Sequence, residues 1–97
     1  MAALLRVEWT ARSERDLAGI HEFILLRWTV READAFLGQV IDFERRIAKW
    51  PKGFRRSERN KQHRLGLVHR NTMAVYRVFR DRIVIITLFD TRSNSPH

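Results

Sequence analysis

The chain has 97 residues and a mass of 11.6 kDa, which predicts one domain over residues 1–97 with a single core. Hydrophobic residues make up 44% and charged residues 31%, which excludes a disordered, collagen-like or low-complexity chain. Cysteine is absent, so disulfides and thiolate metal sites are excluded, and we expect no metal and no cofactor. No stretch has the length of a signal peptide or a membrane span, so we expect a cytoplasmic protein without a membrane partner.

The positive charge is concentrated in one segment. Lys and Arg number 19 against 11 Asp and Glu, for a net charge of +8, and residues 51–70 carry seven basic residues and one acidic residue. Such a segment attracts nucleic acid, an acidic protein or anionic lipid, although it can also serve only solubility. Loop cations without a partnering base bind phosphates but do not activate nucleophiles, so we assign them to binding. The residues assigned to nucleic-acid or target binding are Lys52, Arg55, Arg56, Arg59, Lys61 and Arg64.

The first half of the chain predicts a strand and two helices. Apolar and charged residues alternate over residues 5–9, which is typical of a short strand. Ser13 with Asp16 resembles a capping box, so a helix is expected to begin at Ser13. Thr29 with Glu32 repeats this signature, which predicts a second helix that forms an antiparallel hairpin with the first and ends near Trp50, before Pro51. The residues expected on the buried stripe of the first helix are Leu17, Ile20, Ile24 and Trp28, and core packing is expected for Trp9, Trp28 and Trp50.

The second half predicts an exposed loop followed by three strands. Residues 51–62 are polar and basic, as expected of a loop. Strands are predicted at 63–69, with Leu65 and Leu67 on one face, at 72–79 and at 82–89. The predicted fold is therefore α+β, in the order β-α-α-β-β-β, with a helical hairpin packed on one face of an antiparallel sheet.

This order of elements resembles the RelE/ParE superfamily of bacterial type II toxins. The likeness covers nearly the whole chain and includes three segments: Asp16-Leu17-Ala18-Gly19-Ile20, Trp50-Pro51-Lys52-Gly53-Phe54 and Val75-Tyr76-Arg77-Val78. The resemblance implies a toxin that is neutralised by a cognate acidic antitoxin and that acts on DNA gyrase or on the ribosome. It implies no small-molecule substrate.

The two branches of the superfamily make different demands on the residues. The RelE-like branch cleaves messenger RNA on the ribosome, which needs a base, cations for the phosphorane charge and an acid. Gly66 and Met73 stand where that branch has basic residues. If the chain is such a ribonuclease, its catalytic residues would be Arg64, His69, Arg77 and Arg92.

The ParE-like branch poisons DNA gyrase, is similar at Tyr76-Arg77 and lacks that catalytic set, although Asp90 replaces its usual His. We therefore favour a ParE-like gyrase poison, which would not be an enzyme. A RelE-like endoribonuclease is the alternative. An alternative of another class is a non-toxic basic module that binds nucleic acid.

The final predicted strand also indicates a partner. It is apolar on both faces, whereas two helices cover one face of a four-stranded sheet, so the other face should be exposed and the free protein should self-associate. An acidic antitoxin segment that orders on docking would cover this face beside the basic segment. The residues predicted to bind the antitoxin are Val84, Ile86, Leu88 and Arg64.

Overall fold

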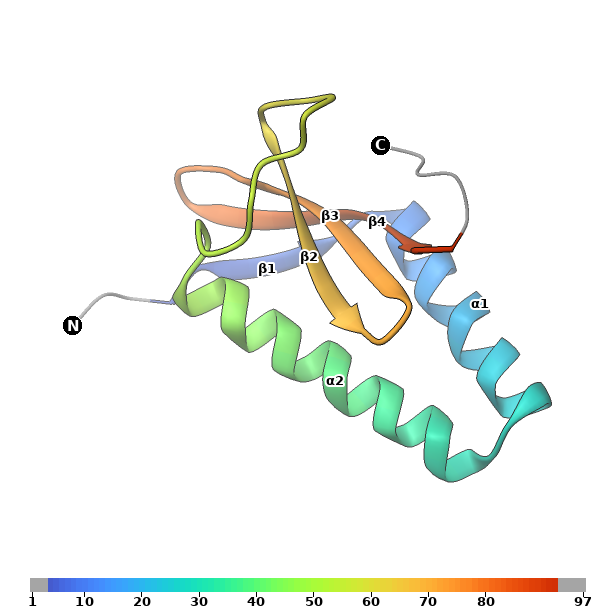
Figure 1. Cartoon of the computed structure of the whole chain (residues 1–97). Coiled ribbons are helices and arrows are strands. Elements are labelled where there is room, and N and C mark those ends of the chain that lie inside the picture. Colours follow the sequence, from blue (N-terminus) through green and yellow to red (C-terminus); the bar gives the residue numbers. More distant parts are fainter. Residues whose placement is uncertain (1–3, 93–97) are drawn as a thin grey trace.

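Two helices and four strands follow one another in the predicted order in the computed structural model, which describes residues 4–92 (Figure 1). The elements are β1 (Arg6–Trp9), α1 (Ala11–Arg27), α2 (Val30–Lys49), β2 (His63–His69), β3 (Thr72–Val78) and β4 (Arg82–Asp90). In Figure 1 the two helices diverge from their short connection, and the sheet lies in the opening between them. Within residues 4–92, no helix is both long enough and apolar enough to cross a membrane.

The sheet is mixed rather than wholly antiparallel. Its strand order is β1-β4-β3-β2, in which β2, β3 and β4 are antiparallel neighbours and β1 is parallel to β4. The alternation of apolar residues in β1 specifies which face is buried but not the direction in which the strand runs. The helical hairpin between β1 and the rest of the sheet provides the long connection that a parallel pair needs.

The two helix starts were predicted with unequal success. Thr29 caps α2 as expected, because its hydroxyl oxygen accepts a hydrogen bond from the Glu32 amide at 3.0 Å. The cap of α1 is Thr10, so the predicted start at Ser13 was wrong by three residues. Ser13 is fully buried instead, and its hydroxyl donates to the carbonyl of Ile85 at 2.8 Å. A serine in this position therefore joins the helix to β4.

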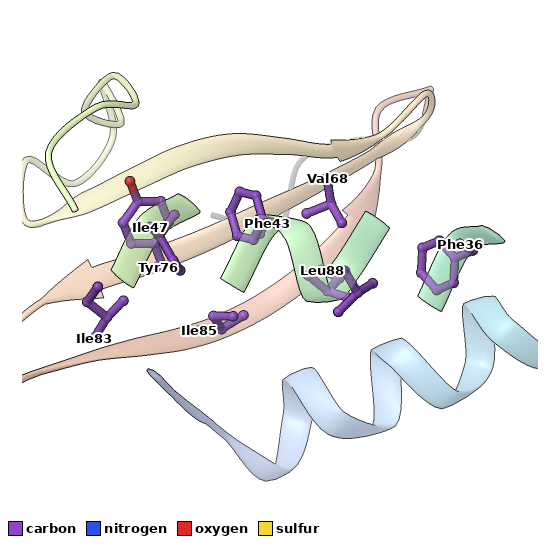
Figure 2. Packing of buried hydrophobic residues seen from close by; sticks show 10 residues of the cluster. Phe36, Phe43, Ile47, Val68, Tyr76, Ile83, Ile85 and Leu88 are labelled. Carbon is purple, nitrogen blue, oxygen red and sulfur yellow. The ribbon is translucent and has the colours of Figure 1, made fainter. Parts of the chain in front are cut away.

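The core is built mainly between α2 and the sheet (Figure 2). Phe36, Phe43 and Ile47 of α2 are at most 4% exposed and pack against Tyr76 of β3 and Ile85 of β4. Burying each such side chain contributes about 1.5–3 kcal/mol. The apolar residues of α1 that reach this core are only partly buried: Leu17, Ile20 and Ile24. As a result, α1 leaves apolar surface open beside the core.

Two of the three tryptophans contradict the prediction of core packing. Trp28 is 69% exposed and Trp50 is 58% exposed. Both are C-cap residues with non-helical backbone angles, so the helical spacing that predicted burial no longer applies to them. Trp9 is partly buried, and its indole Nε1 donates to Glu44 Oε2 at 2.7 Å. Leu67 is also 53% exposed, although Leu65 on the same strand is buried.

A bulge changes which residues of β4 face the helices. Val75 pairs with Thr87 and Tyr76 pairs with Ile85, so Ile86 has no partner on β3. The Asp16 carboxylate fastens α1 at this point, since its Oδ2 accepts from the Thr87 hydroxyl at 2.6 Å and from the Leu88 amide at 3.1 Å. Simple alternation along β4 therefore fails after Ile85.

Candidate functional site

The basic segment before β2 is exposed, but part of its backbone is regularly paired. Part of it runs antiparallel to β2: the Leu65 amide donates to the Arg55 carbonyl at 3.0 Å, and the Ser57 amide donates to the His63 carbonyl at 2.8 Å. This pairing covers the outer edge of β2 over residues 63–65. The predicted binding residues with exposed side chains are Lys52, Arg55, Arg56, Arg59 and Lys61, whereas Arg64 is half-buried.

Buried groups fix the position of this loop. The hydroxyl of Tyr76, a fully buried side chain, donates to the Pro51 carbonyl at 2.9 Å. Burial is the main cause that raises the pKa of Tyr76 to about 12, so this phenol is a neutral donor at neutral pH. Arg64 Nη1 donates to the Phe54 carbonyl at 2.7 Å. Ser57 is fully buried, and its Oγ accepts from the Arg59 amide at 3.2 Å. The cations of the loop are therefore carried on an ordered backbone.

The end of α2 adds two cations that the sequence analysis did not assign. Arg46 lies over the Phe54 ring at 5.0 Å, and the Lys49 ammonium lies over the Trp50 ring at 4.6 Å. Both belong to the last turn of α2, where the negative end of the helix dipole favours cations. Their position shortly before Pro51, at the expected end of the helix, was the sequence signal that could have assigned them to this site. We call these two the basic edge, together with Arg64 of β2 and the two loop residues whose backbone contacts it, Lys52 and Arg56.

The predicted ribonuclease residues do not come together. Arg64 and His69 are five residues apart on β2, which is about 17 Å at ~3.3 Å per residue. Arg77 faces away from the core and stacks on the Phe79 ring at 4.6 Å. Arg92 binds Asp90 through Nη2 at 2.7 Å, near the end of β4 that neighbours the β2–β3 turn. Two of the four residues thus lie at each end of the sheet.

His69 is held between helix and strand. Its ring Nδ1 contacts the Gln39 side-chain oxygen, and the ring packs edge-on against Phe36 at 5.5 Å. Burial, followed by the charge of Arg70, lowers the pKa of His69. The imidazole is therefore neutral at neutral pH and is positioned by packing contacts.

The backbone at Gly66 leaves no room for a basic side chain. A Cβ at this position would lie 2.6 Å from Phe43 Cε1 and 3.1 Å from Phe54 Cδ2. Side-chain atoms do not approach this closely without displacement of a buried ring. Packing therefore explains the glycine at the position where the resemblance to the RelE-like branch implied a basic residue.

A second surface lies at the opposite end of the molecule. A groove of about 790 Å³ opens between α1, the start of α2 and the ends of β3 and β4. Its apolar wall comes from α1 and includes Ile20, Phe23 and Ile24, of which Phe23 is 48% exposed. Trp28 stands at the end of that wall. The charged side chains around the groove are Arg15, Asp16, Arg27, Glu32, Arg70, Asp90 and Arg92.

The four residues predicted to bind an antitoxin do not share one surface. Leu88 is 4% exposed and belongs to the core, and it also lines the groove beside α1. Val84 and Ile86 are half-buried and lie outside the core cluster. Arg64 lies at the other edge of the sheet, on β2. Among residues 4–92, no group of three or more His, Asp or Glu side chains is arranged to hold a metal ion.

Comparison with known proteins agrees with this arrangement. A family model described as the ParE toxin of the type II toxin-antitoxin system parDE matches residues 7–95. A solved structure titled as the chromosomal ParDE toxin-antitoxin system from P. aeruginosa matches with a TM-score of 0.77 at 16% identity, over 92% of this chain and 98% of that chain. The conserved hypothetical protein HP0894 from Helicobacter pylori matches with a TM-score of 0.59 at 12% identity, over 93% and 98%. At these identities the two structures share the fold. No curated protein matches the chain.

Proposed function

Because the chain belongs to the ParE toxin family of type II toxin-antitoxin systems, we propose that it arrests bacterial growth by poisoning DNA gyrase. The observation that carries this proposal is the separation of the residues that RNA cleavage would require. A ribonuclease must hold a base, an acid and phosphate-binding cations around one phosphodiester. Here Arg64 and His69 are separated by about 17 Å along β2. A toxin that acts by binding its target needs no such assembly.

Arg64 and Arg92, two of the residues that the ribonuclease alternative would use, have structural partners in this chain, and so does Tyr76. The Arg64 guanidinium donates to the carbonyls of Phe54 and Lys52, at 2.7 and 3.4 Å. Two hydrogen bonds join Arg92 to Asp90 side-chain oxygens, at 3.0 and 2.7 Å. Tyr76 donates its hydroxyl to Pro51. These contacts favour roles in holding the loop and the end of β4 over roles in proton transfer.

The proposed neutralising partner is an acidic antitoxin whose amphipathic segment lies in the groove beside α1. Ile20, Phe23 and Ile24 offer an apolar wall, and four of the seven charged residues around it are basic. An amphipathic helix that places apolar residues in such a groove and carboxylates at its rim matches both features. Docking there would also cover the exposed Trp28.

Growth and DNA topology test the proposed target. Induced expression in bacteria should stop growth, and purified toxin should inhibit supercoiling by gyrase, while messenger RNA from the arrested cells stays uncut in primer extension. The Arg64→Ala, Arg92→Ala double variant is the control for the ribonuclease alternative, because that alternative needs both cations. Codon-level cleavage that disappears in this variant would overturn the gyrase proposal. Unaffected growth would favour a basic binding module without toxicity.

Hydrogen exchange tests the antitoxin site. Addition of the protein encoded beside the toxin gene should slow exchange of amides in α1 around Ile20 and Ile24, because docking buries that wall. Protection limited to Val84 and Ile86 would place the antitoxin on the outer face of β4 instead. A Phe23→Asp variant should weaken the complex, whereas Leu26→Asp, at a residue 77% exposed and outside the groove lining, should leave it intact.

A further inference from the structure

The basic edge concentrates cations that no carboxylate neutralises. Within the part of the chain that the structure describes, none of its five side chains lies within ion-pair distance of an Asp or Glu. The nearest acidic residue of α2, Glu44, accepts a hydrogen bond from Trp9. Elsewhere the pattern differs, since Arg6 and Arg82 both bind Glu8, and Arg92 binds Asp90. The five cations of the basic edge therefore carry positive charge that no ion pair among the described residues offsets.

Contacts join the residues of the basic edge from three separate elements, which are α2, the loop and β2. The Phe54 ring packs on Phe43 at 5.5 Å, and the Arg46 guanidinium lies over the Phe54 ring at 5.0 Å. The carbonyls of Phe54 and Lys52 accept from Arg64, and Arg56 pairs with Arg64 in an isolated bridge. Like charges brought together on an ordered backbone repel one another, at a cost to stability that a bound polyanion removes.

We propose that the basic edge binds the phosphate backbone of duplex DNA directly. A row of regularly spaced phosphates is the anion that several fixed cations can contact at once, and such contact releases condensed counterions. An acidic protein fits less well, because the large apolar surface that protein interfaces use lies in the groove beside α1. The choice of duplex DNA over RNA rests on the proposed function, since gyrase acts on duplex DNA.

The role of Trp50 would differ between binding of duplex DNA and binding of a single strand. Its ring is 58% exposed beside Lys49 and could stack on an unpaired base. In a duplex the bases are already stacked, so contact with phosphates alone does not use this ring. We therefore expect Trp50→Ala to change the affinity for the duplex by less than about twofold, whereas loss of base stacking would weaken binding by about 5- to 150-fold.

The test is the salt dependence of binding by the full-length toxin to a short labelled duplex, measured by fluorescence anisotropy without gyrase. If five phosphates are neutralised, the affinity should fall about 500-fold between ~50 and ~200 mM salt. In the Lys49→Gln, Lys52→Gln, Arg56→Gln triple variant, which keeps two cations, the fall should be only about 12-fold. The matched control removes three exposed cations elsewhere, Arg12→Gln, Arg31→Gln and Arg80→Gln, and should keep the steeper dependence.

Three results would overturn the inference. The first is equal salt dependence in the triple variant and its matched control, which would indicate only general attraction by net charge. The second is tighter binding of single-stranded DNA or RNA than of the duplex, together with a large loss in Trp50→Ala. The third is absence of duplex binding by a folded toxin. Gyrase is absent from this assay, so the two proposals can fail separately. A toxin that does not bind the duplex can still inhibit supercoiling, and a toxin that does not inhibit supercoiling can still bind the duplex.

Discussion

The groove beside α1 and the basic edge differ in how they combine charge with apolar surface. In the groove, four basic and three acidic side chains surround exposed aromatic and aliphatic groups. At the basic edge, Lys49 lies over the exposed Trp50 ring, and Arg46 lies over Phe54, which is packed against Phe43 of the core. Mixed charge around an apolar wall suits a protein segment with a defined register, whereas unbalanced charge suits a polyanion. A small domain can thus present two surfaces with separate partners.

The largest expected effect on stability comes from adding a side chain at Gly66, because this would displace Phe54, which supports the basic edge. Gly66→Val should destabilise the protein by about 3 kcal/mol, because its Cβ would press on the buried Phe43 and Phe54 rings. Urea unfolding followed by tryptophan fluorescence measures this change. The Gly66→Val, Phe43→Leu pair should recover part of the loss, and an unchanged midpoint in the single variant would contradict the packing account.

An intermediate effect is expected on the groove side, where Asp16 joins α1 to β4. Asp16→Ala should cost about 2 kcal/mol, because it leaves the Leu88 amide and the buried Thr87 hydroxyl without their acceptor. Asp34→Ala, at an exposed acidic residue of α2, is the control and should change the unfolding free energy little. If the comparison between the two regions is right, Asp16→Ala should loosen α1 in hydrogen exchange while the amides of Ser57 and Leu65 keep their protection.

The smallest effect is local to the loop and has a pH signature. Tyr76→Phe should cost about 1 kcal/mol, since only the hydrogen bond to the Pro51 carbonyl is lost. Because the pKa of Tyr76 is raised to about 12, the unfolded chain releases this proton at lower pH than the folded one. The phenol's contribution to stability is therefore complete below about pH 10 and is lost as the pH rises toward about 12. Unfolding curves at several alkaline pH values should show a steeper decline for the wild type than for Tyr76→Phe; parallel declines would contradict the assignment.

Burial was predicted best from the sequence where the apolar residues of one helix all pack on one sheet face. The stripe of α2 was readable because Phe36, Phe43 and Ile47 all face the same sheet. The stripe of α1 was misread at Trp28, because the helix ends there and its backbone turns away. The parallel direction of β1 and the bulge that buries Leu88 had no local signal, since both depend on strand pairing between distant residues.

The positive charge of the basic edge was predictable from the sequence, but the residues that form it were not. The run of cations after Pro51 was visible in the sequence, whereas Arg46 and Lys49 joined it only through packing on Phe54 and Trp50. By contrast, three arginines and a histidine of types suited to phosphate chemistry are distributed over both ends of the sheet: Arg64, His69, Arg77 and Arg92. Distance between strands, rather than composition, decides whether such residues can act together.

The position of β4 in the sheet has a consequence for synthesis of the toxin. This strand is the last of the described elements in the chain, yet it lies between β1 and β3 and supplies Ile83, Ile85 and Leu88 to the core. Until it leaves the ribosome, β1 has no partner strand and α2 has only part of the surface on which it packs. Long-range pairing of this kind delays folding until both partners are present. A growing chain therefore lacks the complete toxin fold until β4 has been synthesised and can pair with both β1 and β3.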